Sequence, residues 1–233
     1  MELTEKLFPD LKDNSKRSRI VISVFYVICI MNIGASISIY FQIIMLEQIQ
    51  MGVILGEEEM SMNDTRQQII SIIQSFIYIA STVLFLNWLR RAYGNINRIG
   101  ENTEYSETMA IWSFVIPFIN LFRPYTITNE IAEKTNSKLR EINYDFSSTS
   151  NFYFVGLWWG LFLLSSLVGQ FVSRYVFQEE TVEHFIFSSQ LMLASNLFDT
   201  LAAVVTLVMI KRISINEMHL FEKHKIHSTD LFN

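Results

Sequence analysis

Four long runs with almost no charge are the feature that most constrains this chain. Residues 20–46, 69–89 and 152–173 hold no Asp, Glu, Lys or Arg, and residues 185–210 hold one, Asp199. A helix needs roughly 20 apolar residues to cross a bilayer core about 30 Å thick, and each run is long enough. Only 18% of all residues are charged. The sequence therefore predicts an all-α, polytopic membrane helical bundle with four transmembrane helices.

The basic residues are sorted between the two ends of these runs. The N-terminal arm (residues 1–19), the long connection 90–151 and the C-terminal tail (211–233) hold all of the 18 Lys and Arg except Arg66 and Arg174. The opposite side carries a long acidic loop. Because Lys and Arg are enriched on the cytoplasmic side of membrane proteins, we expect both termini in the cytoplasm, flanking a membrane domain over residues 20–210.

A fifth apolar stretch, residues 109–122, is too short to cross comfortably. If it crossed, the basic residues would divide nine and nine and the charge asymmetry would vanish. Pro117 removes a backbone donor, and Arg123 precedes a second proline, which disfavours helical geometry. We therefore expect the segment 107–123 to enter the membrane on the cytoplasmic side, break between Asn120 and Arg123, and return. The alternative is an amphipathic helix lying flat on the inner surface.

The flanking segments have helical signals. The second run continues as a helix to Gly100, a suitable residue for a helix C-terminus. Residues 124–143 predict a cytoplasmic amphipathic helix, because Ile127, Ile131 and Leu139 form an apolar stripe at helical spacing.

Two segments of this region carry a motif, W-L-R-R-A-Y-G-N-I at 88–96 and I-P-F-I-N-L-F-R-P-Y at 116–125. They resemble a family of bacterial membrane proteins catalogued as domain of unknown function 4328. The matching positions are Trp88, Arg91, Ala92, Tyr93, Asn95, Pro117, Phe118, Asn120, Leu121, Arg123, Pro124 and Tyr125. The resemblance implies a four-span domain in a bacterial inner (plasma) membrane, and it implies no activity. The acidic outer loop and the tail depart from the family pattern.

Four polar side chains of the motif, Arg91, Asn95, Asn120 and Arg123, have two alternative roles. Backbone carbonyls freed around the prolines need partners, which these side chains can supply. Alternatively, Arg91 and Arg123 bind an anion such as a lipid headgroup phosphate. Trp88 fits the aromatic belt at the membrane interface.

Asp199 lies deep in the fourth run, where a charge costs at least roughly 2.5 kcal/mol. None of the runs contains Lys or Arg to pair with it. Asp199 is therefore either a neutral acid held by Asn32, Gln74 or Asn196, or a site for a proton or cation in transit.

The chain lacks the sequence signatures of a nucleophile elbow, a phosphate-binding loop or a metal site. We expect no enzyme, no cofactor, no metal and no nucleic-acid partner. The first hypothesis is a non-enzymatic scaffold, sensor or accessory module that presents residues 90–151 to a cytoplasmic or membrane protein. The second is a small channel or transporter that uses Asp199 and the broken segment. Because four spans rarely enclose a pathway, the second hypothesis requires a homo-oligomer in the lipid bilayer.

Overall fold

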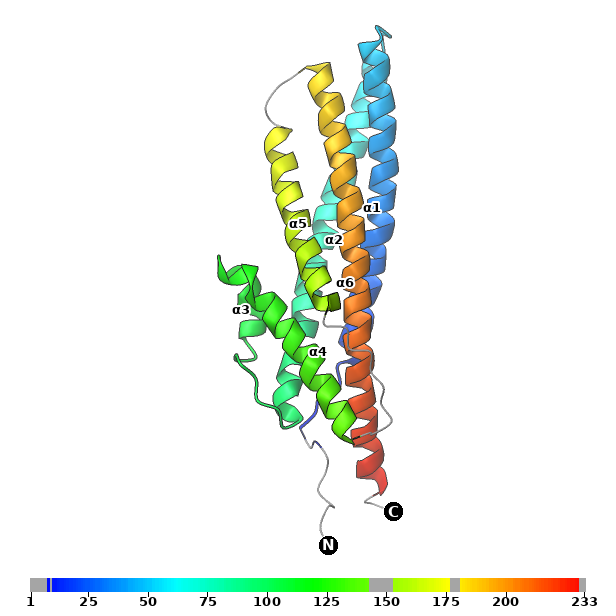
Figure 1. Ribbon diagram of the computed structural model, residues 1–233. Helices are drawn as coiled ribbons and strands as arrows, with labels where there is room; N and C mark the ends of the chain where they lie inside the picture. Colours follow the sequence, from blue (N-terminus) through cyan, green and yellow to red (C-terminus); the bar gives the residue numbers. More distant parts are fainter. Residues whose placement is uncertain (1–7, 9, 143–152, 177–180, 231–233) are drawn as a thin grey trace. The chain divides into compact units, whose positions relative to one another are not determined.

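The computed structural model describes residue 8 and residues 10–142, 153–176 and 181–230 (Figure 1). In these residues the helices are α1 (Ser15–Gln50), α2 (Glu57–Arg98), α3 (Met109–Val115), α4 (Arg123–Ile142), α5 (Tyr153–Tyr175) and α6 (Val182–Asp230), with a 3₁₀ helix, η1 (Ile119–Leu121). Four of them, α1, α2, α5 and α6, are long and apolar enough to cross a membrane. The prediction of an all-α chain with four candidate spans is confirmed. The last part of the predicted connection 90–151, from residue 143 onward, lies outside the described residues.

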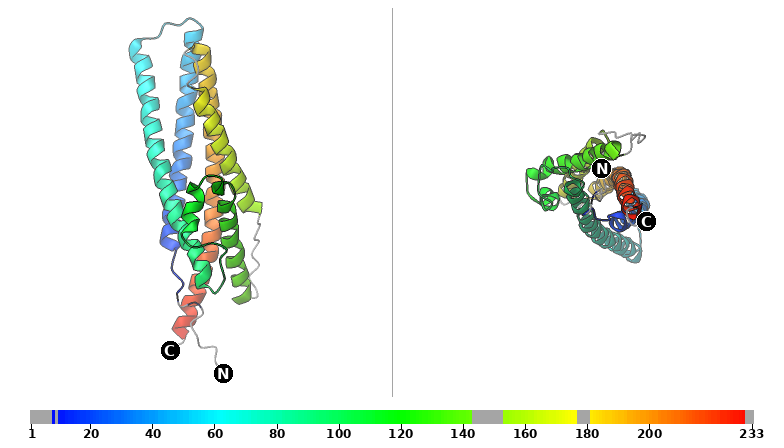
Figure 2. Two further views of the ribbon diagram at one scale, coloured as in Figure 1. Left: turned by 90° about the vertical axis from the view of Figure 1, so that its left-hand side faces the viewer. Right: turned by 90° about the horizontal axis from the view of Figure 1, so that it is seen from below.

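Two of the long helices extend well beyond the charge-free runs. The helix α2 begins at Glu57, so the acidic stretch expected to be a loop is mostly helical, and only residues 51–56 connect α1 to α2 (Figure 2). Three glutamates occupy its first turn, where negative charge is favourable beside the positive end of the helix dipole. The helix α6 continues from the fourth run to Asp230, so the expected tail is largely helical.

The chain divides into two compact units. Unit 1 comprises Met1–Ser23, Thr82–Trp159 and Leu207–Asn233, and unit 2 comprises Val24–Ser81 and Gly160–Thr206. The helices α1, α2, α5 and α6 each contribute a segment to both units.

Unit 2 holds most of the apolar helix surface, and polar side chains link its helices. The Nε of Arg66 on α2 donates to the Oγ of Ser38 on α1 at 3.0 Å. The Nε2 of Gln42 on α1 donates to the Oγ of Ser189 on α6 at 3.0 Å. Hydrogen bonds of this kind suit helices that associate in lipid, where moving apolar side chains from lipid tails to a helix interface gains little because both are apolar.

Unit 1 is organised by the end of α2 and by α4. The motif residues Trp88 and Tyr93 are fully buried. The stripe predicted for the amphipathic helix, Ile127, Ile131 and Leu139, is buried along α4. The end of α2 is also as predicted: Gly100 has φ +83, and the N–H of Glu101 donates to the carbonyl of Ile96 at 3.2 Å, which closes the helix.

The break in the fifth apolar stretch comes earlier than expected. Ile116 is extended because it precedes Pro117, and Phe118 has φ +64, so α3 ends at Val115. Arg123, expected to avoid helical geometry, is instead the first residue of α4. A proline is tolerated in the first turn of a helix, where its missing N–H has no intrahelical partner to lose.

The segment from α3 to η1 packs on two of the long helices within unit 1. The ring of Phe114 makes edge-to-face contacts with Phe85 of α2, at 5.8 Å between centroids, and with Trp159 of α5, at 5.9 Å. The indole Nε1 of Trp159 donates to the carbonyl of Leu121 at 2.8 Å. In Figure 1, α3 and α4 lie next to one another beside the end of α2. The broken segment is therefore fixed by side chains of α2 and α5.

Candidate functional site

Asn95, on the last turns of α2, forms two hydrogen bonds with the backbone of Lys12. Its Nδ2 donates to the carbonyl oxygen of Lys12 at 2.9 Å, and the N–H of Lys12 donates to its Oδ1 at 3.3 Å. A primary amide can replace a neighbouring peptide group in this way because it carries both a donor and an acceptor. The buried side chain of Asn95 thus fixes the segment that precedes α1.

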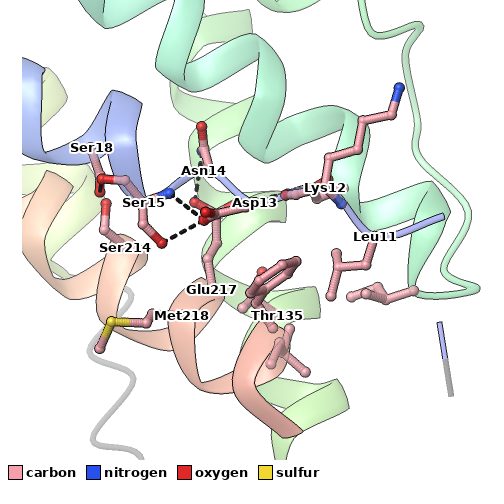
Figure 3. A pocket seen from close by; sticks show the side chains of 14 residues that line it. Leu11, Lys12, Asp13, Asn14, Ser15, Ser18, Thr135, Ser214, Glu217 and Met218 are labelled. Carbon is pink, nitrogen blue, oxygen red and sulfur yellow. Dashed lines mark hydrogen bonds between the residues drawn. The ribbon is translucent and has the colours of Figure 1, made fainter. Parts of the chain in front are cut away.

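Glu217 of α6 joins this arrangement from the other side. Its carboxylate accepts hydrogen bonds from the Nδ2 of Asn14 at 3.0 Å and from the Nδ2 of Asn95 at 3.3 Å. Figure 3 shows the Glu217 side chain directed from α6 toward Asn14. We call Lys12, Asn14, Asn95 and Glu217 the Asn95 clasp. A cavity of about 20 Å³, large enough for one water molecule, borders all four residues.

The carboxyl group of Glu217 titrates near neutral pH. Burial raises its pKa to about 7, although the hydrogen bonds from Asn14 and Asn95 and the nearby charge of Arg91 oppose the rise. The Asn95 clasp therefore contains a group that changes its charge in the physiological range.

Tyr93, two residues before Asn95 on α2, holds a second irregular segment. Its hydroxyl donates to the Oε2 of Glu130 at 2.7 Å and accepts from the N–H of Tyr105 at 3.0 Å. The Oε1 of Glu130 accepts from the N–H of Glu104 at 2.9 Å and from Lys134. Burial and the bond to Glu130 raise the pKa of the Tyr93 phenol. The connection between α2 and α3 is thereby fixed to both α2 and α4.

Glu107 pairs with two arginines of α2. It lies 3.2 Å from Arg98 and 3.6 Å from Arg90. The pair with Arg98 lies directly against Gly94: a Cβ atom at this position would come within 2.6 Å of the Glu107 Cδ and 2.7 Å of the Arg98 Nη1. The ion pair therefore depends on the absence of a side chain at residue 94.

The structure does not bring the four polar residues predicted as one site together. No hydrogen bond or ion pair within the described part of the chain joins any two of Arg91, Asn95, Asn120 and Arg123. Arg123 lies over the ring of Tyr105, 4.7 Å from its centroid. Of these four side chains, Asn95 has the expected role of hydrogen-bonding free backbone groups. The groups that it bonds belong to Lys12 and not to the residues around Pro117.

The other motif residues are divided between buried and exposed positions, and Pro117, Phe118 and Leu121 are exposed. Ala92 is buried on α2 and Pro124 on α4, whereas Tyr125 is partly exposed. Trp88, expected in an interfacial belt, is fully enclosed, and its ring lies 5.7 Å from that of Phe85.

In unit 2, Asp199 has a partner that the sequence analysis missed. The hydroxyl of Ser165 on α5 donates to its carboxylate. The expected partners bond elsewhere: the Nε2 of Gln74 donates to the Oδ1 of Asn32 at 3.1 Å, and the hydroxyl of Tyr78 donates to the same oxygen at 2.8 Å. Asn32 and Gln74 thus link α1 to α2.

Glu217 and Glu130 were not predicted as site residues, although the sequence contains a signal for both. Glu217 shares a helical face with Ile213 and Leu220, and Glu130 follows Ile127 on the apolar face of α4. An acid on an apolar helical face needs a buried partner. Lys12 had no such signal, since it contributes only its backbone.

A family model described as "Domain of unknown function (DUF4328)" matches residues 52–215. The chain belongs to this family. No curated protein and no solved structure matches the chain. The matched region contains Tyr93, Asn95 and Asp199 but excludes Lys12, Asn14 and Glu217. The Asn95 clasp therefore joins a residue of the DUF4328 region to segments on both sides of it.

Replacing Gly94 by alanine tests the close packing of the ion pair. The new methyl group displaces the flexible ends of Glu107 or Arg98, so we expect a melting temperature in detergent below that of the control, corresponding to at most about 1 kcal/mol for a partly exposed ion pair. Gly160→Ala is the control, because the position is helical and no atom lies within 4 Å of the added Cβ. Equal stability of the two variants would show that the pair tolerates the displacement.

Replacing Glu217 by glutamine tests the titration of the clasp. The ordinary pKa of a glutamate is 4.5, and that of folded Glu217 is about 7. Between these values the folded state keeps a proton that the unfolded state releases, so stability falls as pH rises from about 4.5 to about 7. We expect amide hydrogen exchange in residues 10–18, corrected for its intrinsic pH dependence, to lose protection over this range in the wild type but not in Glu217→Gln.

The control for this measurement is Glu222→Gln, which removes an exposed acid from the same helix. It should keep the wild-type pH dependence. A Glu217→Gln protein with the same loss of protection as the wild type would assign the titration to another group.

Proposed function

We propose that this DUF4328 protein is a non-enzymatic membrane module, a scaffold, sensor or accessory subunit that presents unit 1 to a protein partner. One observation carries the proposal: two buried polar side chains of the motif, those of Asn95 and Tyr93, are occupied with backbone groups. Asn95 bonds both polar groups of Lys12, and Tyr93 accepts from the N–H of Tyr105. A catalytic acid or base must instead reach a substrate. These buried residues are suited to holding a surface in place.

The surface that they support includes the outer face of α4. Glu133, Ser137 and Arg140 are exposed there, on the side opposite the buried stripe. A helix fixed along one face and charged along the other suits recognition by a polar protein surface. The mixed charges favour a protein partner over a nucleic acid, which would select for basic residues.

We further propose a bacterial inner-membrane location with both termini cytoplasmic, which the sorting of Lys and Arg supports. The segment from α3 to η1 would then be half-inserted from the inner side. Trp112, Phe118 and Phe122 support this because they are 54%, 82% and 70% exposed, respectively. Large apolar side chains in such positions favour the boundary between headgroups and acyl chains.

Cysteine labelling in cells tests this topology. In a Cys29→Ser background, single cysteines replace Ser61, Asn120, Glu133 and Glu222, and an impermeant maleimide is applied before and after permeabilisation. We expect Ser61 to react in intact cells, Glu133 and Glu222 only after permeabilisation, and Asn120 slowly in both. Labelling of Glu133 and Glu222 from outside would mean that the segment crosses the membrane. Rapid labelling of Asn120 after permeabilisation would place the segment on the surface.

A second candidate function is an oligomeric channel or transporter. It is favoured by Asp199, an acid within a candidate span that is hydrogen-bonded by a serine hydroxyl. Intramembrane acids of this kind mark many ion and proton pathways.

Flux from liposomes separates the two functions. For the module we expect reconstituted protein to release neither protons nor monovalent cations above the rate of empty vesicles. Conduction that Asp199→Asn abolishes, and that the control Asp64→Asn retains, would establish the transport function in its place. Asp64 is an exposed acid on α2 outside the charge-free run.

A further inference from the structure

Arg91 has an unusual environment for a half-buried cation. It makes no hydrogen bond or ion pair with any residue that the structure describes. Its charged neighbours are mainly arginines: Arg17, Arg98 and Arg90 act on it, together with Glu107. Burial and these like charges lower the pKa of its guanidinium. The side chain is thus surrounded by positive charge without a bonded acceptor of its own.

The hydrogen bonds around Arg91 show how the cluster is assembled. The Nε of Arg17, in the first turn of α1, donates to the Oδ1 of Asn87 at 3.4 Å. Asn87 lies one helical turn before Arg91 on α2, so the two arginines are on the same side of that helix. Arg98 lies two turns after Arg91 on the same face.

The carboxylates near this cluster are already bonded. Glu107 pairs with Arg98 and Arg90. Glu217, which the charge of Arg91 also affects, accepts from Asn14 and Asn95. The charge of Asp13 also acts on Glu217, and the carboxylate of Asp13 already accepts from Ser15. Glu217 itself becomes neutral below about pH 7. Among the described residues, Arg17 and Arg91 are the two arginines of this cluster that form no ion pair.

We propose that Arg17 and Arg91 form a binding site for a phosphate group. A phosphate oxygen is a strong acceptor for guanidinium donors, and one anion between the two side chains would relieve their repulsion. Arg17 precedes the first charge-free run and Arg91 follows the second. In a bilayer this is the level of lipid phosphates. The same chemistry also fits free phosphate. Arg123, the partner expected from the sequence, is replaced in this site by Arg17.

This site goes beyond the scaffold function and does not depend on whether the protein conducts ions. Its test uses full-length protein in an uncharged sugar detergent at constant ionic strength. One arm adds a short-chain phosphatidylglycerol, another adds inorganic phosphate, and a third adds chloride. Binding is measured by the shift of the melting temperature and by titration calorimetry.

The test variant is Arg17→Gln/Arg91→Gln, and its matched control is Lys16→Gln/Arg19→Gln. The control removes the same number of charges from exposed side chains of the first turns of α1. We expect the affinity for the phospholipid to fall at least about tenfold in the test variant, because charge-assisted hydrogen bonds are lost. The affinity of the control variant for the phospholipid should stay within about twofold of the wild-type affinity.

Two further outcomes decide the proposal. Binding of both phospholipid and inorganic phosphate would mean that the phosphate group is sufficient, and binding of the phospholipid alone would identify a lipid headgroup. Without added phospholipid or phosphate, the test variant should melt at or above the wild-type temperature, because the repulsion between the two arginines is removed. This result excludes misfolding as the cause of lost binding. The proposal is overturned if neither ligand binds, or if the test variant and the control bind equally well.

Discussion

Backbone N–H and C=O groups outside regular helices need hydrogen-bond partners, and this requirement governs unit 1. A buried peptide group without a partner costs as much as a lost hydrogen bond, and little water is present near apolar spans. Side chains of the long helices provide the partners. Asn95 donates to the carbonyl of Lys12, and Trp159 donates to the carbonyl of Leu121. The hydroxyl of Tyr93 accepts from the N–H of Tyr105. Each of these three side chains fixes a different non-helical segment, so the positions of α3, η1 and the segment before α1 all follow from them.

The same network couples charge to structure. Arg91 lowers the pKa of Glu217, whereas burial raises it. An anion that neutralises Arg91 would remove one of the influences that favour the ionised carboxylate. Protonation of Glu217 would in turn leave the arginines with a larger excess of positive charge. By linkage, each event strengthens the other to the same extent. The phosphate site and the Asn95 clasp would therefore act as one device that responds to both proton and anion.

Local patterns in the sequence predicted the elements, whereas distant partners could not be predicted. The apolar runs mark α1, α2, α5 and α6, and Ile127, Ile131 and Leu139 mark the buried face of α4. The residue before Pro117 set the end of α3, although the break was expected a few residues later. The clasp joins residues separated by 83 and 122 positions. One sequence contains no information on such pairings, and the Lys12 contribution is independent of its side chain.

Polar groups in unit 2 link its helices to one another. The Oδ1 of Asn32 accepts from Gln74 and from Tyr78, so these side chains join α1 to α2. Asp199 differs, since Ser165 provides a single hydroxyl. One donor is adequate for a neutral carboxyl group but not for a carboxylate in a low-dielectric environment. Transport of ions past Asp199 would require further donors, which a second copy of the chain would have to provide.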